Sequence, residues 1–163
     1  MMTFENQPVR VEHINTRTEY HGDDEVLALD LIITTDLPNT SLDRLSSTLR
    51  RSLYDADGTG DLVDPDHTPR LRNPQLGTLH WSGSFPADFT FSDSDHDDDL
   101  PFTDAKLDRI RFVPREGGTV AYTFRVKVYP GDEQVSARVL SLLHRPGVRG
   151  TLDVFEEEAE TVD

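Results

Sequence analysis

The sequence contains no cysteine, only two lysines and no long apolar run. The absence of cysteine excludes a disulfide framework, a cysteine-bound iron–sulfur cluster and thiolate-bound zinc. No segment approaches the roughly 18 consecutive apolar residues of a membrane span. The first eight residues have neither the basic stretch nor the apolar region of a secretory signal. We therefore expect a soluble, cytoplasmic protein, located in the cytoplasm of the host cell if the chain is encoded by a bacteriophage.

The common signatures of enzyme active sites are also missing. The chain has no G-x-S-x-G, no P-loop and no G-x-G-x-x-G, and its six histidines do not occur at the H-x-x-x-H spacing of a zinc site. Carboxylate pairs are so frequent that none stands out as an acid/base couple. The expected class is a binding or accessory protein, not an enzyme.

The sequence is rich in acidic residues. Its 31 Asp and Glu residues outnumber 16 Lys and Arg residues, which gives a net charge of −15. This balance disfavours a whole surface that is attracted to phosphates, because such binding needs clustered cations. The preference for Arg over Lys, together with the abundant Asp, fits either a GC-rich genome or adaptation to salt.

The charge is distributed unevenly along the chain. Residues 1–104 carry 21 acidic and 7 basic side chains, residues 105–150 carry 4 and 9, and residues 151–163 carry 6 and none. A basic segment therefore lies between two acidic ones.

Within the basic segment, apolar residues alternate with polar ones in residues 109–113 and 119–128, which is typical of half-buried strands. Gly117-Gly118 predicts the turn of a hairpin. One face would enter the core with Ile110, Phe112, Val120, Tyr122, Phe124, Val126 and Val128. The opposite face would carry Arg109, Arg111, Arg125 and Lys127. This basic face has two interpretations, a solvated surface paired with neighbouring carboxylates or a groove for phosphates or an acidic partner.

Further strands are predicted at residues 9–14, 26–33, 77–82, 89–91 and 152–155, with a turn at 21–24 and a bend at Pro86. The leucines at 42, 45, 49 and 53 predict a short amphipathic helix, and Asp132 is expected to cap a second helix that Pro146-Gly147 stops. The fold class is mainly β, or α+β: an antiparallel β-sandwich or partly open, OB-like barrel with one or two short helices. We expect residues 1–155 to form one domain and residues 156–163 to form an acidic flexible tail.

One stretch is similar to a 12-residue calcium loop. Its oxygen-bearing residues stand near the required positions, Gly60 is at position 6 and an apolar residue is at position 8. The candidate calcium ligands are Asp55, Asp57, Thr59, Asp61 and Asp66. Prolines at 65, 69 and 74 leave no room for the exiting helix of an EF-hand, so a plain Asp/Gly turn region is the alternative. No other cofactor is expected.

Four stretches together resemble a family of small uncharacterised proteins from tailed bacteriophages and prophages. They are residues 17–26, 49–54 and 71–77, and Gly117-Gly118 followed by residues 124–126. The resemblance covers most of the chain. It implies a gene among early replication and recombination functions, and therefore a role around DNA, but it assigns no catalytic residue.

Two shorter likenesses concern bacterial and phage single-stranded-DNA-binding proteins. The first stretch is similar to their acidic tip, which recruits partner enzymes, and comprises Asp97, Asp98, Asp99 and Phe102. The second is similar to their acidic tails and includes Glu156, Glu157 and Glu158. The first lacks a terminal carboxylate after the Phe, and the second lacks an aromatic residue at its end.

Three hypotheses of function follow. The leading one is a phage-type accessory protein of DNA metabolism whose basic face binds single-stranded DNA or a replication or recombination partner. The second is an acidic protein that imitates the charge of DNA and occupies a DNA-binding protein. The third is a calcium-binding structural module at residues 55–66. Whether the four cations are exposed together or paired with carboxylates distinguishes the first two.

Overall fold

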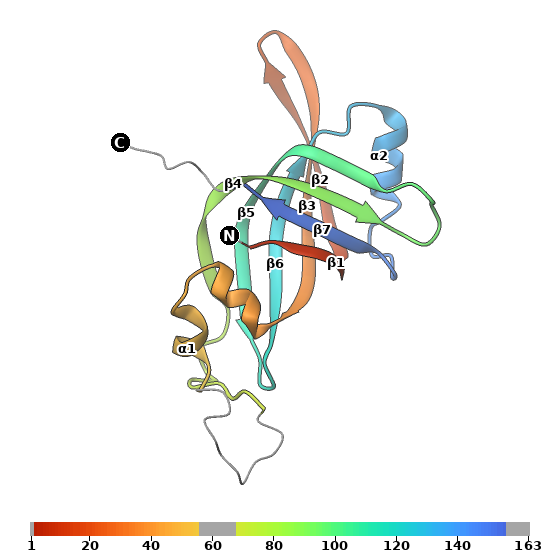
Figure 1. The fold of residues 1–163 in the computed structure, drawn as a ribbon. Coiled ribbons are helices and arrows are strands. Elements are labelled where there is room, and N and C mark those ends of the chain that lie inside the picture. The colour runs from red at the N-terminus through yellow and green to blue at the C-terminus, as the bar shows by residue number, and fades with distance from the viewer. Residues whose placement is uncertain (1, 56–67, 156–163) are drawn as a thin grey trace.

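The computed structural model describes residues 2–55 and 68–155. Seven antiparallel strands form one sheet in the order β1-β7-β4-β5-β6-β3-β2 (Figure 1). The strands are β1 (Phe4–Pro8), β2 (Arg10–His21), β3 (Asp24–Pro38), β4 (Leu79–Ser92), β5 (Leu100–Pro114), β6 (Thr119–Val128) and β7 (Arg149–Val154). The helices are the 3₁₀ helix η1 (Asn39–Arg44), α1 (Leu49–Leu53) and α2 (Glu133–Leu140). The predicted class, a mainly antiparallel β domain with short helices, is confirmed.

The two edge strands of this sheet are consecutive in the chain. Only Val9 separates β1, which pairs with β7, from β2, which pairs with β3. The amide of Val9 donates to the carbonyl of Val148, at 3.0 Å. The sheet therefore curls until its edges meet at one residue, and it forms a partly open barrel (Figure 1).

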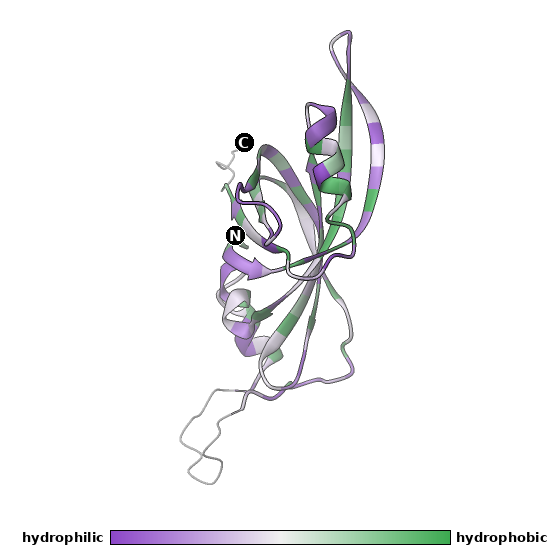
Figure 2. Ribbon diagram, turned by 90° about the vertical axis from the view of Figure 1, so that its right-hand side faces the viewer, coloured by the Kyte–Doolittle hydropathy of each residue, from purple (hydrophilic) through white to green (hydrophobic). Residues whose placement is uncertain are grey.

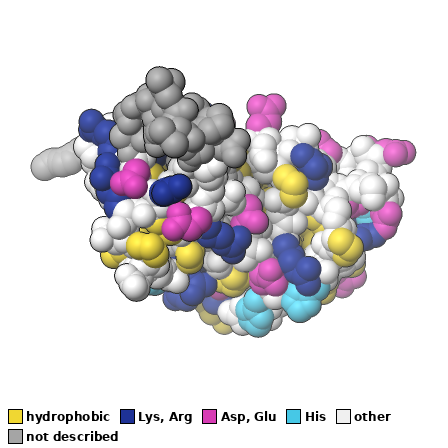
Figure 3. All heavy atoms as spheres, turned by 90° about the horizontal axis from the view of Figure 1, so that it is seen from below, with side chains coloured by type: hydrophobic (Ala, Val, Ile, Leu, Met, Phe, Trp, Pro, Cys, Tyr) yellow, Lys and Arg dark blue, Asp and Glu magenta, His cyan; other side chains and the backbone are white. Residues whose placement is uncertain are grey.

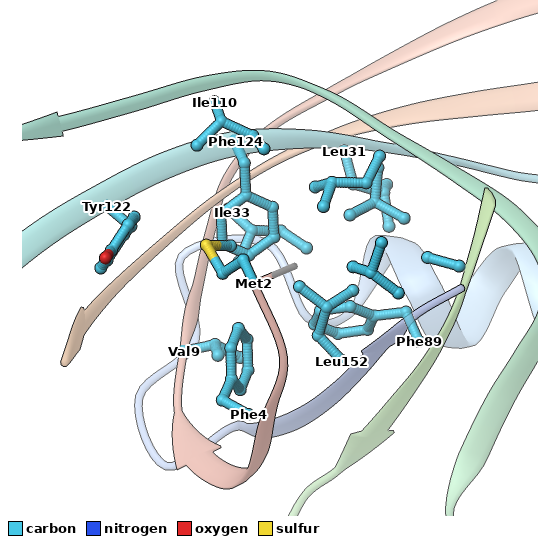
Figure 4. Close-up of a cluster of buried hydrophobic side chains, with 14 of the residues drawn as sticks. Met2, Phe4, Val9, Leu31, Ile33, Phe89, Ile110, Tyr122, Phe124 and Leu152 are labelled. Carbon is cyan, nitrogen blue, oxygen red and sulfur yellow. The ribbon is translucent and has the colours of Figure 1, made fainter. Parts of the chain in front are cut away.

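The concave side of the sheet holds the core, which includes a cluster of phenylalanines (Figure 4). Phe89 is fully buried, and its ring centroid lies 6.3 Å from Phe4, 4.7 Å from Phe91 and 6.4 Å from Phe124. These rings come from β1, β4 and β6, so the cluster joins strands that are far apart in the sequence. Aromatic pairs at such distances add to the free energy gained by burial.

The helix predicted over residues 42–53 forms in two pieces, η1 and α1. The break falls at residues 45–48, where the Ser46 hydroxyl lies 3.4 Å from the amide of Thr48 and 3.2 Å from its hydroxyl. Serine and threonine side chains that bond to nearby backbone in this way compete with continuous helix. Asp132 caps α2 as predicted, by accepting a hydrogen bond from the Val135 amide at 2.8 Å, but the helix already ends at Leu140, before Pro146-Gly147.

β4 is one continuous strand, although two strands around a bend at Pro86 were predicted. β7 pairs with β4 only from Ala87 to Ser92, so Pro86 lies just beyond the end of that ladder. The missing N–H of a proline at this position therefore costs no hydrogen bond between β4 and β7. The irregularity appears instead as register shifts on either side, between Trp81 and Ser84 and between Ala87 and Phe89. β1 was not predicted at all.

The hairpin of β2 and β3 extends beyond the rest of the sheet, at the top of Figure 1, and α2 lies beside it (Figure 2). Its turn contains Gly22, at φ +70°, where the sequence predicted a turn. Two large apolar side chains near its end are exposed, Tyr20 at 69% and Leu27 at 43%.

Candidate anion-binding surface

The outer face of the β5–β6 hairpin carries the predicted basic residues. All seven apolar side chains that were assigned to the inner face are buried there, including Ile110 at 1% exposure and Phe124 at 0%. Arg109 and Arg111 are exposed on the other side, and Arg125 and Lys127 are half-buried. The period-2 alternation therefore predicted the two faces of this hairpin correctly.

Two of the four predicted cations are held in ion pairs. Arg125 Nε and Nη2 donate to the two carboxylate oxygens of Asp108, at 2.8 and 2.6 Å. Lys127 Nζ lies 3.1 Å from Glu19 Oε2. The hydrogen bonds from Arg125 to Asp108 raise the pKa of the guanidinium above its usual value. These two side chains are committed to the fold and contribute little net positive charge to a ligand.

The two pairs belong to a larger outer-face ion network, comprising Arg17, Glu19, Asp30, Asp108, Arg125 and Lys127. Arg17 donates to both oxygens of Asp30, at 2.7 and 3.1 Å, and also contacts Glu19 at 2.9 Å. Asp30 is only 4% exposed. Burial favours its neutral form, but the hydrogen bonds and charge of Arg17 outweigh this and lower the pKa of Asp30. Three cations and three anions leave the network neutral.

Glu19 is the most connected member of this network. Its carboxylate accepts a hydrogen bond from the Tyr129 hydroxyl at 2.9 Å and lies against Lys127, Arg17 and His21. The Tyr129 hydroxyl makes the largest contribution and Lys127 the next, and together the partners lower the pKa of Glu19 to about 2.

Sequence reasoning missed Arg17, Glu19 and Asp30. A signal was present, since Asp30 stands in the otherwise apolar stretch 26–33. The turn at residues 22–23 fixes the register that places Asn15 opposite Asp30 and Arg17 opposite Ala28. Arg17 and Asp30 are then diagonal neighbours, close enough for long side chains to meet.

Arg109 and Arg111 lie at a β-bulge. Asp108 is opposite Arg125 and Arg111 is opposite Thr123, so β5 contains one residue more than β6 in this interval. Arg109 itself has φ +53°, a conformation that residues other than glycine seldom adopt. Bulges of this kind re-aim side chains and often occur at functional sites.

A shallow surface hollow of about 310 Å³ adjoins the bulge. Its lining residues are His80, Trp81, Ser82, Gly83, Ser84, Asp108, Arg109 and Ile110. His80 stands opposite Arg111 in the β4–β5 ladder, which brings an imidazole beside the guanidinium. Trp81 packs against the core, as its position in a strand predicted.

Within residues 2–55 and 68–155, neither Arg109 nor Arg111 forms an ion pair. We define the bulge surface as Arg109, Arg111, His80, Ser82 and Ser84. It combines two guanidinium groups with hydroxyl and imidazole donors, which is the chemistry that binds phosphate or carboxylate oxygens. On the lower face of the molecule, Lys and Arg side chains lie interspersed with Asp and Glu (Figure 3).

The predicted acidic partner-binding residues are separated by the fold. Asp97, Asp98 and Asp99 are exposed in the loop between β4 and β5, where Arg138 of α2 donates to the Asp98 carbonyl. Phe102 was predicted to bind a partner together with them, but it lies in the core, where it is 5% exposed and its ring centroid is 6.3 Å from that of Phe91. The alternation of β5 turns it inward. Glu156, Glu157 and Glu158 lie outside the described residues.

The calcium prediction falls mostly outside the described chain. Asp57, Thr59, Asp61 and Asp66 are not described, whereas Asp55 is exposed and lies 3.3 Å from Arg72. Among the residues that the structure places, no three His, Asp or Glu side chains gather in a way that would hold a metal ion.

Comparisons with known proteins return no match among protein-family models, curated proteins or solved structures. In the described part of the chain, no helix is both long and apolar enough to cross a membrane.

Proposed function

We propose that this protein is a non-enzymatic accessory protein of DNA metabolism that binds single-stranded nucleic acid at the bulge surface. The observation that carries the proposal is that Arg109 and Arg111, alone among the four predicted cations, have no carboxylate partner in the described chain. A cation without such a partner is available to a phosphate, and its contact releases condensed counterions. The resemblance to bacteriophage proteins of early gene regions supports the same role.

The overall charge favours a single strand over a duplex. A protein of net charge −15 is repelled by nucleic acid, and the repulsion increases with the density of phosphate charge. Double-stranded DNA carries roughly one charge per 1.7 Å of its axis, which is denser than a flexible single strand. Two arginines offset this repulsion more readily when the ligand is the less densely charged one.

The expected binding is weak and has a shallow salt dependence. Two phosphate contacts predict a slope of about −1.4 in log K against log salt, whereas four contacts would give about −3. The shallower value follows because Arg125 and Lys127 are held by Asp108 and Glu19. We expect affinity in the micromolar range or weaker at low salt.

The test is fluorescence anisotropy of a labelled single-stranded oligonucleotide at several salt concentrations. Arg109→Ala with Arg111→Ala should abolish binding. Arg44→Ala with Arg51→Ala is the matched control, because it removes the same charge from exposed positions on η1 and α1. The proposal fails if both double variants weaken binding equally, or if the unaltered protein does not bind at low salt.

A second candidate function rests on acidic residues near the two ends of α2. Glu25 of the β2–β3 hairpin lines a hollow of about 380 Å³ together with Asp132 and Glu133, and Asp97, Asp98 and Asp99 lie at the other end of the helix beside Arg138. Such a surface would bind a basic DNA-binding protein by complementary charge. A hexa-arginine peptide is a suitable probe. Its affinity should fall with Asp97→Asn, Asp98→Asn and Asp99→Asn combined, and should not change with Arg109→Ala and Arg111→Ala.

A further inference from the structure

β2 has an open edge along most of its length. It pairs with β3 on one side, and no strand in the described part of the chain pairs with its other side. The beginning of this edge is covered by the segment before β7, where the His144 amide donates to the Val11 carbonyl at 2.9 Å and His144 Nε2 lies 2.8 Å from the Glu12 carbonyl. The uncovered part runs from His13 to His21.

The uncovered part of this edge lacks several of the devices that prevent pairing with another chain, because the register shift of β2 lies before it, between Val11 and His13. Residues 13–21 contain neither proline nor lysine. The two charged residues within it, Arg17 and Glu19, are drawn onto the outer face by Asp30 and Lys127. Thr16, Thr18 and Tyr20 are exposed on the opposite face. A long edge strand of regular register presents a row of unpaired backbone N–H and C=O groups, with which a further strand can pair.

We infer that two copies of this chain associate through β2, antiparallel and about a two-fold axis at Thr18. The resulting sheet continues through both protomers. The strand is self-complementary in this register, because residue numbers that face each other add up to 36. Arg17 then faces Glu19 of the second copy on the outer side, twice by symmetry. On the other side Thr16 faces Tyr20, and Thr18 faces Thr18.

Neighbouring registers do not fit. Residues that face each other must have their side chains on the same face of the sheet. The two-fold axis can therefore pass only through a residue, and an alternative register moves the axis to a neighbouring residue. An axis at Arg17 places two arginines opposite each other, and an axis at Glu19 places two glutamates opposite each other. Like charges directly opposite in adjacent strands are destabilising. Only the Thr18 axis pairs each of these two charges with its opposite.

The edge proposal is independent of the bulge surface, and it is tested by cross-linking. The chain has no cysteine, so Thr18→Cys introduces a single thiol at the axis. Residues opposite each other across the axis lie within disulfide range. Under mild oxidation we expect a disulfide-linked dimer of Thr18→Cys. The control Thr119→Cys, at an exposed position at the start of β6, should give no disulfide-linked dimer at equal concentration, because this position lies away from the β2 edge.

The molecular mass in solution provides a second test of the dimer. Sedimentation velocity at moderate salt, which screens the repulsion between two molecules of charge −15, should show a dimer that dissociates on dilution. Thr18→Lys places two lysines opposite each other at the axis and should give a monomer, whereas Thr119→Lys should still form the dimer. A monomer at all concentrations for the unaltered chain, or equal cross-linking of the two cysteine variants, would overturn the inference.

Discussion

Arg125 of β6 binds both carboxylate oxygens of Asp108 on the adjacent strand β5, at 2.8 and 2.6 Å. The two residues are directly opposite each other in the β5–β6 ladder, and both side chains are about one-fifth exposed. This relationship changes the basic face that the sequence predicted. Of the four predicted cations, Arg109 and Arg111 are left without a carboxylate partner in the described chain, and under the proposed function Asp108 competes with the ligand for Arg125.

Replacing Asp108 by Asn should therefore strengthen the proposed nucleic-acid binding. The released Arg125 adds a third phosphate contact, so the salt slope should steepen from about −1.4 to about −2.1. Urea unfolding should show a loss of stability on the order of 1 kcal/mol, because the pair is only partly exposed. Asp97→Asn removes the same charge from an exposed loop and is the control. Equal strengthening by both variants would mean that Arg125 takes no part.

The low pKa of Glu19, about 2, makes stability depend on pH through this residue. An unfolded glutamate titrates near 4.3, so the ion network stabilises the folded state fully above that pH, and the contribution is lost as the pH falls toward 2. In urea unfolding from pH 7 to pH 2.5, Glu19→Gln should be less stable than the unaltered protein at pH 7, and the difference should shrink below about pH 4.5. Glu25→Gln, on the same hairpin but outside the network, should show no such trend. A difference that stays constant with pH would contradict the assignment.

Gly117 and Gly118 in the β5–β6 turn should respond differently to alanine. Both have positive φ, +89° and +91°, so each substitution costs roughly 1–2 kcal/mol of backbone strain. At Gly118 the added Cβ would also lie 2.9 Å from Pro69 Cγ, whereas at Gly117 the nearest side-chain atom is 4.0 Å away. Because the proline ring has little freedom to move, Gly118→Ala should lower the free energy of unfolding more than Gly117→Ala. Equal urea midpoints for the two variants would show that Pro69 moves away from the added Cβ without lowering the free energy of unfolding.

The faces of the strands could be predicted from sequence, but their partners could not. Alternation placed Ile110 and Phe124 inside and Arg109 outside, because side chains on a strand alternate regardless of which strand lies beside it. The ion pairs depend on register. Asp108 meets Arg125 only because the bulge and the Gly117-Gly118 turn set that alignment, and neither Glu19 nor Lys127 signals its partner across 108 residues of chain.

The β-bulge at Arg109 could not be predicted from the sequence. Positive φ is usually marked by glycine, and the residue that adopts it here is Arg109. Local composition was equally misleading at Pro86, where β4 continues because the β7 ladder begins only at Ala87. Phe102 was assigned to the acidic run that precedes it, yet the alternation of β5 buries it.

The meeting of the sheet edges at Val9 has a consequence for synthesis of the protein. Phe4, in β1, pairs with Leu152, in β7, so β1 leaves the ribosome long before the strand it pairs with. β1 therefore has no partner strand until residues 149–154 have been synthesised, and contacts between residues so distant in sequence form slowly. Until β7 has been synthesised, the core around Phe4 and Phe89 is incomplete. The nascent chain then exposes these two side chains, and chaperones at the ribosome can bind them.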